Sequence, residues 1–104
     1  MIEIRYSDRL IKMNGHAGHG EIGKDIVCAG ASALWLAVAS KMEKEQRLCH
    51  VTVSFHQEKG NTAIFIKTIK PGYEERIREV WDTFICGMQV IASNYPDCVS
   101  LKKI

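Results

Sequence analysis

A histidine and a cysteine lie twelve residues apart, separated by a glycine-rich segment, and their side chains are suited to nucleophilic chemistry. The segment from Gly15 to Lys24 holds four of the eight glycines in the chain and two of its four histidines, His16 and His19. Cys28 follows shortly after it. A thiol within hydrogen-bond reach of an imidazole forms an activated nucleophile, with the imidazole acting first as base and then as acid toward the leaving amine.

The residues after this loop predict a helix that has Asp25 as its N-cap. Cys28 would then lie in the first turn, where free backbone N–H groups and the positive end of the helix dipole favour a thiolate. The same amides could hold an oxyanion. Small residues follow, among them Gly30 and Ser32, and they leave room for a peptide backbone. We therefore take Cys28 as the candidate nucleophile and His16, on the flexible loop, as the candidate general base.

Simpler interpretations of the same residues stay open. A cysteine on a helix is usually a small packed side chain, and helix capping alone explains Asp25. His16 would then end a strand, and His19 would be a solvated loop residue. Ser32, one turn after the candidate nucleophile, would bond a backbone carbonyl or shape the site. The other cysteines have no neighbouring base in the sequence and are interpreted as structural. These are Cys49, Cys86 and Cys98.

Two other chemistries use the same segment. A metal site would recruit four side chains, those of His16, His19, Glu21 and Cys28. Their spacing does not match a standard zinc site. Glycines before a helix could also cradle a phosphate, but the segment matches neither nucleotide-binding pattern, and the carboxylates of Glu21 and Asp25 would repel the phosphate. We expect neither a metal nor a cofactor.

The composition indicates one ordinary globular domain. The 104 residues are 46% hydrophobic and 25% charged, which allows a single domain over residues 1–104 and excludes a disordered or collagen-like chain. The formal net charge is +2 and the basic residues form no cluster along the chain, so no nucleic-acid partner is expected. No stretch reaches the ~18 apolar residues of a membrane span, and the first residues have a strand pattern unlike a signal peptide. Free thiols in a reducing cytoplasm are expected.

Periodicity predicts the elements that must position these residues. Apolar and polar residues alternate over 2–6, 10–14, 49–57 and 62–69, which predicts four strands, and residues 99–101 allow a short fifth. Helical spacing predicts one helix from Asp25 to about Arg47 and a second between Pro71 and Pro96. The order β-β-α-β-β-α-β predicts a single α+β domain in which two helices pack on a largely antiparallel sheet.

The sequence also makes predictions about the surface. His50 and His56 alternate with polar residues and are expected to face solvent, as is the charged stretch from Glu74 to Glu79. The second helix carries more aromatic surface than one small sheet covers, which favours pairing of two copies. Its aromatic residues are Tyr73, Trp81, Phe84 and Tyr95.

The segment from Gly15 to Ala33 resembles the signature of a known family, the ribosomal-processing cysteine proteases called Prp. That signature runs G-H-A, a glycine-rich loop, then D-I-V-C-A, and a serine four residues after the cysteine. At this spacing the chain has His16, Asp25, Cys28 and Ser32. The length and the order of elements also agree with the family, although outside the signature the resemblance is one of pattern.

The resemblance implies a small cytoplasmic bacterial endopeptidase that forms a homodimer. It would remove a short N-terminal extension from large-subunit ribosomal protein twenty-seven, without contacting nucleic acid or a membrane. Cys28 matches the nucleophile and His16 the general base, while Asp25 and Ser32 match supporting positions. An apolar cleft beside Cys28 would receive the peptide, and a mobile flap would order over it. Besides His16, this flap would contain Gly15, Gly18, His19, Gly20 and Gly23.

Two other functions are compatible with the sequence. A relative encoded by a phage or a mobile element would process a virion protein that carries a similar extension. A ribosome-associated binding module would use the loop only to contact a partner, without chemistry.

Overall fold

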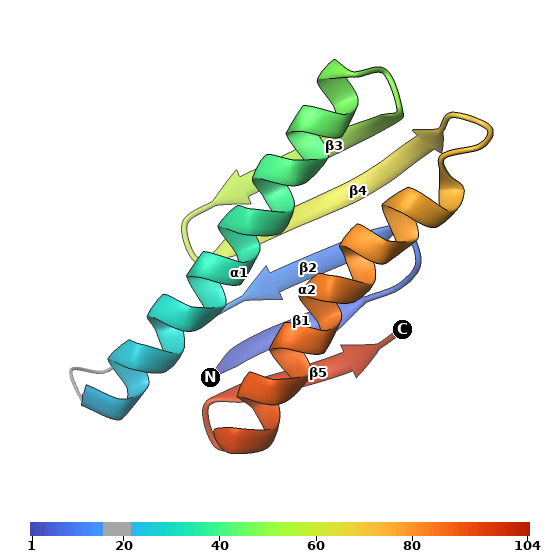
Figure 1. The fold of residues 1–104 in the computed structure, drawn as a ribbon. Helices are drawn as coiled ribbons and strands as arrows, with labels where there is room; N and C mark the ends of the chain where they lie inside the picture. The colour runs from blue at the N-terminus through green and yellow to red at the C-terminus, as the bar shows by residue number, and fades with distance from the viewer. Residues whose placement is uncertain (16–21) are drawn as a thin grey trace.

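Both helices lie on one face of a single five-stranded sheet (Figure 1). A computed structural model of the chain describes residues 1–15 and 22–104, apart from the side chains of residues 22–25. The predicted order of elements is confirmed. The elements are β1 (Ile2–Tyr6), β2 (Leu10–Asn14), α1 (Ile22–Arg47), β3 (Val51–Glu58), β4 (Asn61–Ile69), α2 (Glu74–Asn94) and β5 (Val99–Lys103).

The strands lie in the order β3-β4-β2-β1-β5. Neighbouring strands are antiparallel except for β1 and β5, which are parallel. The prediction of a largely antiparallel α+β domain is therefore confirmed. The first and last strands are neighbours because α2 carries the chain back across the sheet before β5 begins (Figure 1).

Strand alternation sends the apolar side chains toward the helices. In β1, Ile2 and Ile4 are buried, whereas Glu3 and Arg5 are exposed on the opposite face. The other core residues come from every element of the fold. They are Ile11, Val27, Ala31, Trp35, Val38, Met42, Val51, Val53, Ile64, Ile66, Ile77, Trp81, Phe84, Ile85, Met88 and Val99.

The two helices contact each other through large side chains and one glycine. The rings of Trp35 and Phe84 meet edge to face, with 6.3 Å between their centroids. At Gly87 the helices approach so closely that an added Cβ would lie 2.9 Å from Cδ1 of Leu34. The indole N–H of Trp81 donates to the carbonyl oxygen of Ser7 at 2.8 Å. The aromatic side chains of α2 were expected to exceed what one small sheet covers. They are instead largely in contact with other residues of the same chain.

The start of α1 differs from the prediction. The helix begins at Ile22, so Gly23 belongs to the helix rather than to a flexible loop, and Asp25 lies in the first turn rather than at the N-cap. A single glycine costs a helix only about 1 kcal/mol. An acidic residue suits the first turn as well as the cap, because both positions face the positive end of the dipole. Neither residue therefore fixes where this helix starts.

Helix α1 is also largely apolar from Ile26 to Ser40, before its charged last turns. Between Ile26 and Arg47 it has the length and the mean hydropathy, 1.3, of a helix that could cross a membrane. Core helices of soluble proteins meet the same criterion, so this is weak evidence. In this fold Val27, Trp35 and Met42 of the helix are buried in the core.

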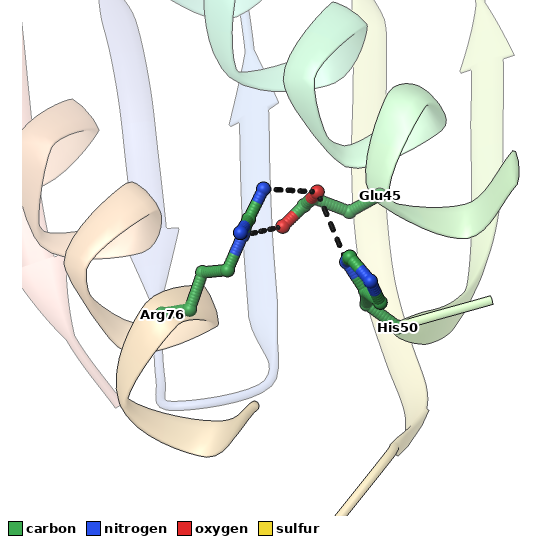
Figure 2. A network of polar contacts seen from close by, with 3 residues as sticks. All are labelled: Glu45, His50 and Arg76. Carbon is green, nitrogen blue, oxygen red and sulfur yellow. Dashed lines mark hydrogen bonds and ion pairs between the residues drawn. The ribbon is translucent and has the colours of Figure 1, made fainter. Parts of the chain in front are cut away.

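A buried carboxylate joins α1, α2 and the start of β3 (Figure 2). The side chain of Glu45 is fully buried. The guanidinium of Arg76 donates to both of its oxygens, through Nε to Oε1 and through Nη2 to Oε2, the latter at 3.2 Å. His50 Nδ1 lies 3.3 Å from Oε2 and carries the hydrogen, since a carboxylate only accepts. The imidazole of His50 in turn stacks on Tyr73, with 3.9 Å between the ring centroids.

This network corrects one prediction about the surface, because His50 is half-buried rather than solvent-facing. Arg76 is exposed as predicted, and its guanidinium also pairs with the buried Glu45. His56 is likewise exposed as predicted. Residues 45 and 76 lie on different helices, so no local sequence pattern indicates that their side chains meet.

The network also sets the ionisation of Glu45. Burial by itself raises the pKa of this carboxyl group, but hydrogen bonds from Arg76 and His50 and the positive charges of Arg76 and Lys41 outweigh it. The pKa of Glu45 therefore lies below its ordinary value of 4.5. The ionised form stabilises the folded state above that value, and this contribution is lost as the pH falls through the lower, folded-state pKa.

We predict that Glu45→Gln lowers the free energy of unfolding at pH 7 by about 1.5–3 kcal/mol, because two hydrogen bonds from a charged donor are weakened. The loss should shrink as the pH falls below 4.5, because the carboxyl group of the unfolded chain takes up its proton before the folded one does. Urea denaturation between pH 3 and 7 measures both effects. Glu43→Gln, an exposed change on the same helix, is the control and should be nearly neutral. An equal loss for Glu45→Gln at every pH would contradict the prediction.

Candidate active site

A cleft of about 580 Å³ opens beside the N-terminal half of α1. Four segments that are distant in the sequence line it: the start of β1, the end of β2, α1, and the hairpin that joins β3 to β4. The described lining residues are Ile2, Met13, Gly15, Cys28, Ala31, Ser32 and the hairpin residues 57–62. Three predicted site residues, Gly15, Cys28 and Ser32, therefore line the same cleft.

Cys28 and Ser32 reach the cleft from successive turns of α1. The Cys28 side chain is half-buried and packs against the hydrophobic core, whereas Ser32 is exposed. Ala31 is buried beside them. The spacing of four residues places both polar groups on one side of the helix, so a bound molecule could contact the thiol and the hydroxyl together.

The early start of α1 changes the electrostatic argument for Cys28. Cys28 lies in the second turn, because the helix begins at Ile22. The backbone N–H groups that no helical carbonyl accepts belong to residues 22–25, and the effect of the dipole falls off within the first turn. Activation of the thiol therefore has to come mainly from a neighbouring base, not from the helix itself.

The floor and the outer wall of the cleft differ in polarity. Ile2 and Met13 form an apolar floor together with Ala31 of α1. The hairpin supplies a polar wall of backbone and side-chain groups. Its lining residues are Gln57, Glu58, Lys59, Gly60, Asn61 and Thr62. An extended peptide would find both an apolar surface and hydrogen-bonding groups here.

Gly15 holds the cleft segments together where β2 ends. Its N–H donates to the carbonyl oxygen of Gly60 in the hairpin turn at 2.9 Å. Its φ of +92° is one that residues with a side chain rarely adopt. A Cβ at this position would also overlap the carbonyl oxygen of Met1. The backbone at Gly15 thus fixes the point from which the chain continues to His16.

Several predicted residues fall outside the described part of the chain. These are His16, Gly18, His19, Gly20 and Glu21, together with the side chain of Asp25. The structure therefore describes neither the histidine–cysteine pair nor the alternative metal set beyond its Cys28. Among the described residues, no group of three histidine, cysteine or acidic side chains could hold a metal ion.

The sequence analysis did not identify the hairpin as part of the site. Lys59 and its neighbours lie some thirty residues after Cys28 along the chain. They reach the cleft because β4 pairs with β2, which sets Asn61 opposite Asn14, the residue before Gly15. Only a prediction of that strand pairing would have found them.

Comparisons with known proteins agree on one family. The family model described as cysteine protease Prp matches residues 1–100. The chain is 26% identical over 103 residues to the ribosomal processing cysteine protease Prp of Mycoplasma genitalium, a match that covers 99% of this chain and 96% of that protein. Over 22 residues, 21% of each chain, it is 77% identical to the protein of the same name from Staphylococcus aureus strain Mu50.

Two solved structures share the fold over nearly the whole chain. SMU.848 from Streptococcus mutans superposes with a TM-score of 0.76 at 26% identity, covering 100% of this chain and 94% of that one. The essential ribosomal processing protease Prp from S. aureus has a TM-score of 0.74 at 25% identity, covering 99% and 97%. That second structure contains a covalently linked product peptide.

We predict that Gly15→Ala destabilises the protein more than Gly72→Ala does. Both glycines have a positive φ, +92° and +94°, so each substitution adds backbone strain of about 1–2 kcal/mol. Only at Gly15 does the new Cβ meet another atom, the Met1 carbonyl oxygen, since nothing lies within 4 Å at Gly72.

Urea denaturation gives the two stabilities. Hydrogen exchange of the Ile2 amide, which donates to the Cys98 carbonyl oxygen, reports whether the N-terminal strand has moved. Hydrogen exchange at the Ile2 amide should be faster in Gly15→Ala than the loss of global stability alone would make it. Equal destabilisation by both variants, with unchanged exchange at Ile2, would show that Met1 does not constrain this position.

Proposed function

The chain belongs to the Prp family of cysteine proteases, and we propose that it removes an N-terminal extension from large-subunit ribosomal protein twenty-seven. Because the family is one of cysteine proteases, the chain is a peptidase. The main support for the finer proposal is that Cys28 opens onto a cleft of peptide-binding size, with Ser32 one turn further along the helix. The relatives from M. genitalium and S. aureus are ribosomal processing proteases, which supports a ribosomal substrate.

Cys28 acts as the nucleophile and His16 as the general base in this proposal. The thiol of Cys28 gives its proton to His16, and the thiolate attacks the carbonyl carbon of the scissile peptide bond. The C–N bond breaks as His16 returns the proton to the leaving amine, and the extension remains on Cys28 as a thioester. Water then hydrolyses the thioester, which releases the extension as a carboxylate and restores the thiol. The product peptide covalently linked to the S. aureus relative is consistent with chemistry at a nucleophilic side chain.

The remaining signature residues support this step. Asp25 lies in the first turn of α1, where it helps to position the start of the helix that carries Cys28. Ser32 offers a hydroxyl to the bound peptide from the same wall of the cleft. Beyond the fixed position of Gly15, the loop glycines Gly18 and Gly20 allow the chain carrying His16 to close over the peptide. No metal or cofactor takes part, and the reaction takes place in the cytoplasm.

We also propose that two copies of the chain pair through the outer surfaces of the helices. Ile26, Leu36 and Val90 are about 60% exposed there, more than the core of a single copy would leave uncovered. A shallow groove of about 220 Å³ lies between the helices, lined in part by Leu34 and Val80. We expect a dimer in sedimentation experiments at micromolar concentration, and a monomer would remove this part of the proposal.

We predict that Cys28→Ala abolishes peptide cleavage while the protein stays folded. The substrate is a peptide with the N-terminal segment of protein twenty-seven from the same host, and the products are identified by mass spectrometry. The rate should fall at least about a thousandfold, because no other group replaces the nucleophile. Cys86→Ala, a change at an exposed cysteine of α2, is the matched control and should cleave at the wild-type rate.

If Cys28→Ala cleaves the peptide at the wild-type rate, Cys28 is not the nucleophile. If the folded wild type leaves the ribosomal peptide intact but cuts the extension of a virion protein, the ribosomal substrate is wrong and the nucleophile stands. Thiol labelling alone does not identify Cys28, because Cys49 and Cys86 are more exposed than it is. Labelling therefore has to be done with both of these replaced by serine.

A further inference from the structure

Both helices lie on one face of the sheet, which leaves the other face uncovered (Figure 1). Strand register and exposure place three positively charged side chains in a row on that uncovered face. Strand register pairs Lys102 of β5 with Arg5 of β1, and Arg5 with Lys12 of β2. All three are exposed, and each lies next to strand residues that point into the core. We call Lys102, Arg5 and Lys12 the cationic row. The same row continues through Ala63 to His56.

Among the described residues, no carboxylate forms an ion pair with the cationic row. Within the part of the chain that the structure describes, neither Arg5, Lys12 nor Lys102 takes part in an ion pair or a side-chain hydrogen bond. Like charges directly opposite each other on neighbouring strands destabilise a sheet. The fold therefore keeps an unfavourable arrangement that a bound polyanion would turn into a favourable one.

The rows on either side add hydrogen-bonding and stacking groups. Toward the cleft, the exposed side chains of Ser100, Glu3 and Asn61 lie on the same face. On the other side, Phe65 is 46% exposed and is paired with Leu10, two residues before Lys12 in β2. An exposed aromatic ring beside cations on a flat sheet is the arrangement on which single-stranded nucleic acid stacks its bases.

We propose that this open sheet face binds single-stranded RNA. Neighbouring strands are about 4.8 Å apart, so the cationic row is about 10 Å long. Its three cations can neutralise up to about three phosphates of one nucleic-acid strand. The cationic row contacts these phosphates, and a base stacks on Phe65. Ser100 and Asn61 offer partners for the 2′-hydroxyl groups, which DNA lacks.

Other occupants fit this face less well. A second copy related by twofold symmetry would bring the cationic row of one subunit close to that of the other, so like charges would repel. An anionic membrane would satisfy the charge but would leave the aromatic ring and the hydrogen-bonding row without a use. None of the residues of the cationic row, nor Phe65, lines the cleft, although Asn61 lies at the border of the two sites. The inference therefore does not depend on the proposed protease function.

The test is fluorescence anisotropy with a labelled single-stranded RNA of about 12 nucleotides at ~50 and ~200 mM salt. Three neutralised phosphates predict that log Kobs falls with log salt with a slope of about −2. Changing Arg5, Lys12 and Lys102 together to glutamine should weaken binding at least about tenfold and bring the slope close to zero. Phe65→Ala should weaken binding about fivefold or more and leave the slope unchanged, because stacking is not ionic.

Two control variants keep the test falsifiable. Changing Lys44, Arg47 and Arg78 to glutamine removes the same charge from exposed helix positions and should alter binding less than about twofold. Exchanging lysine and arginine within the cationic row keeps the charge and should keep the affinity. Melting temperatures of the glutamine variant should not fall, since the change relieves repulsion.

Four results would overturn the proposal. These are no RNA binding at low salt, equal weakening by the two glutamine triples, equal binding of the matching single-stranded DNA, and binding to phosphatidylserine vesicles without binding to RNA. The last result would assign the face to a membrane. Cleavage of a short peptide is expected to be the same in all these variants, so a failure here is distinct from a failure of the protease assignment.

Discussion

Every strand of the sheet alternates between a face covered by helices and a face open to solvent, and this alternation constrains the rest of the molecule. A shift of one residue in β1 would exchange Ile4 for Arg5 in the core, so the register is fixed by burial. Once it is fixed, α1 must lie where its own apolar side meets the strands. Cys28 then faces the end of the sheet where Gly15 bonds to Gly60. The cleft follows from the same constraint that makes the core.

Much of this arrangement could be predicted from the sequence, because it depends on local patterns. Period-two alternation identified the strands to within two residues, and the apolar stripes identified both helices. The signature cysteine and serine, predicted to lie one turn apart on one helix, both line the cleft. The start of α1 was wrong by three residues, since glycine and aspartate permit several starts and do not select one. The C-terminal end of α1 was predicted correctly from the sequence. Cys49, with a φ of +64°, lies just after the helix, at a position where glycine is more usual.

What the sequence did not reveal depends on contacts between distant segments. Glu45 and Arg76 meet because two helices pack side by side, and each residue alone has the pattern of a surface charge. The polar wall of the cleft reaches Cys28 through the pairing of β2 with β4. The cationic row combines residues 5, 12 and 102, which show no cluster along the chain. Each of these features requires the strand order, which periodicity alone does not determine.

The parallel pairing of β1 with β5 has a consequence for the time at which the edge of the cleft is completed during synthesis of the chain. Ile2 lines the cleft, and its N–H is held by the carbonyl oxygen of Cys98, just before β5. These two segments are the most widely separated in the sheet, and contacts over such separations form slowly. A nascent chain makes β5 after the other described elements, so both hairpins and both helices can form while the β5-facing edge of β1, which carries Ile2, is still unpaired. The edge of β1 that borders the cleft is therefore completed only once β5 has been made.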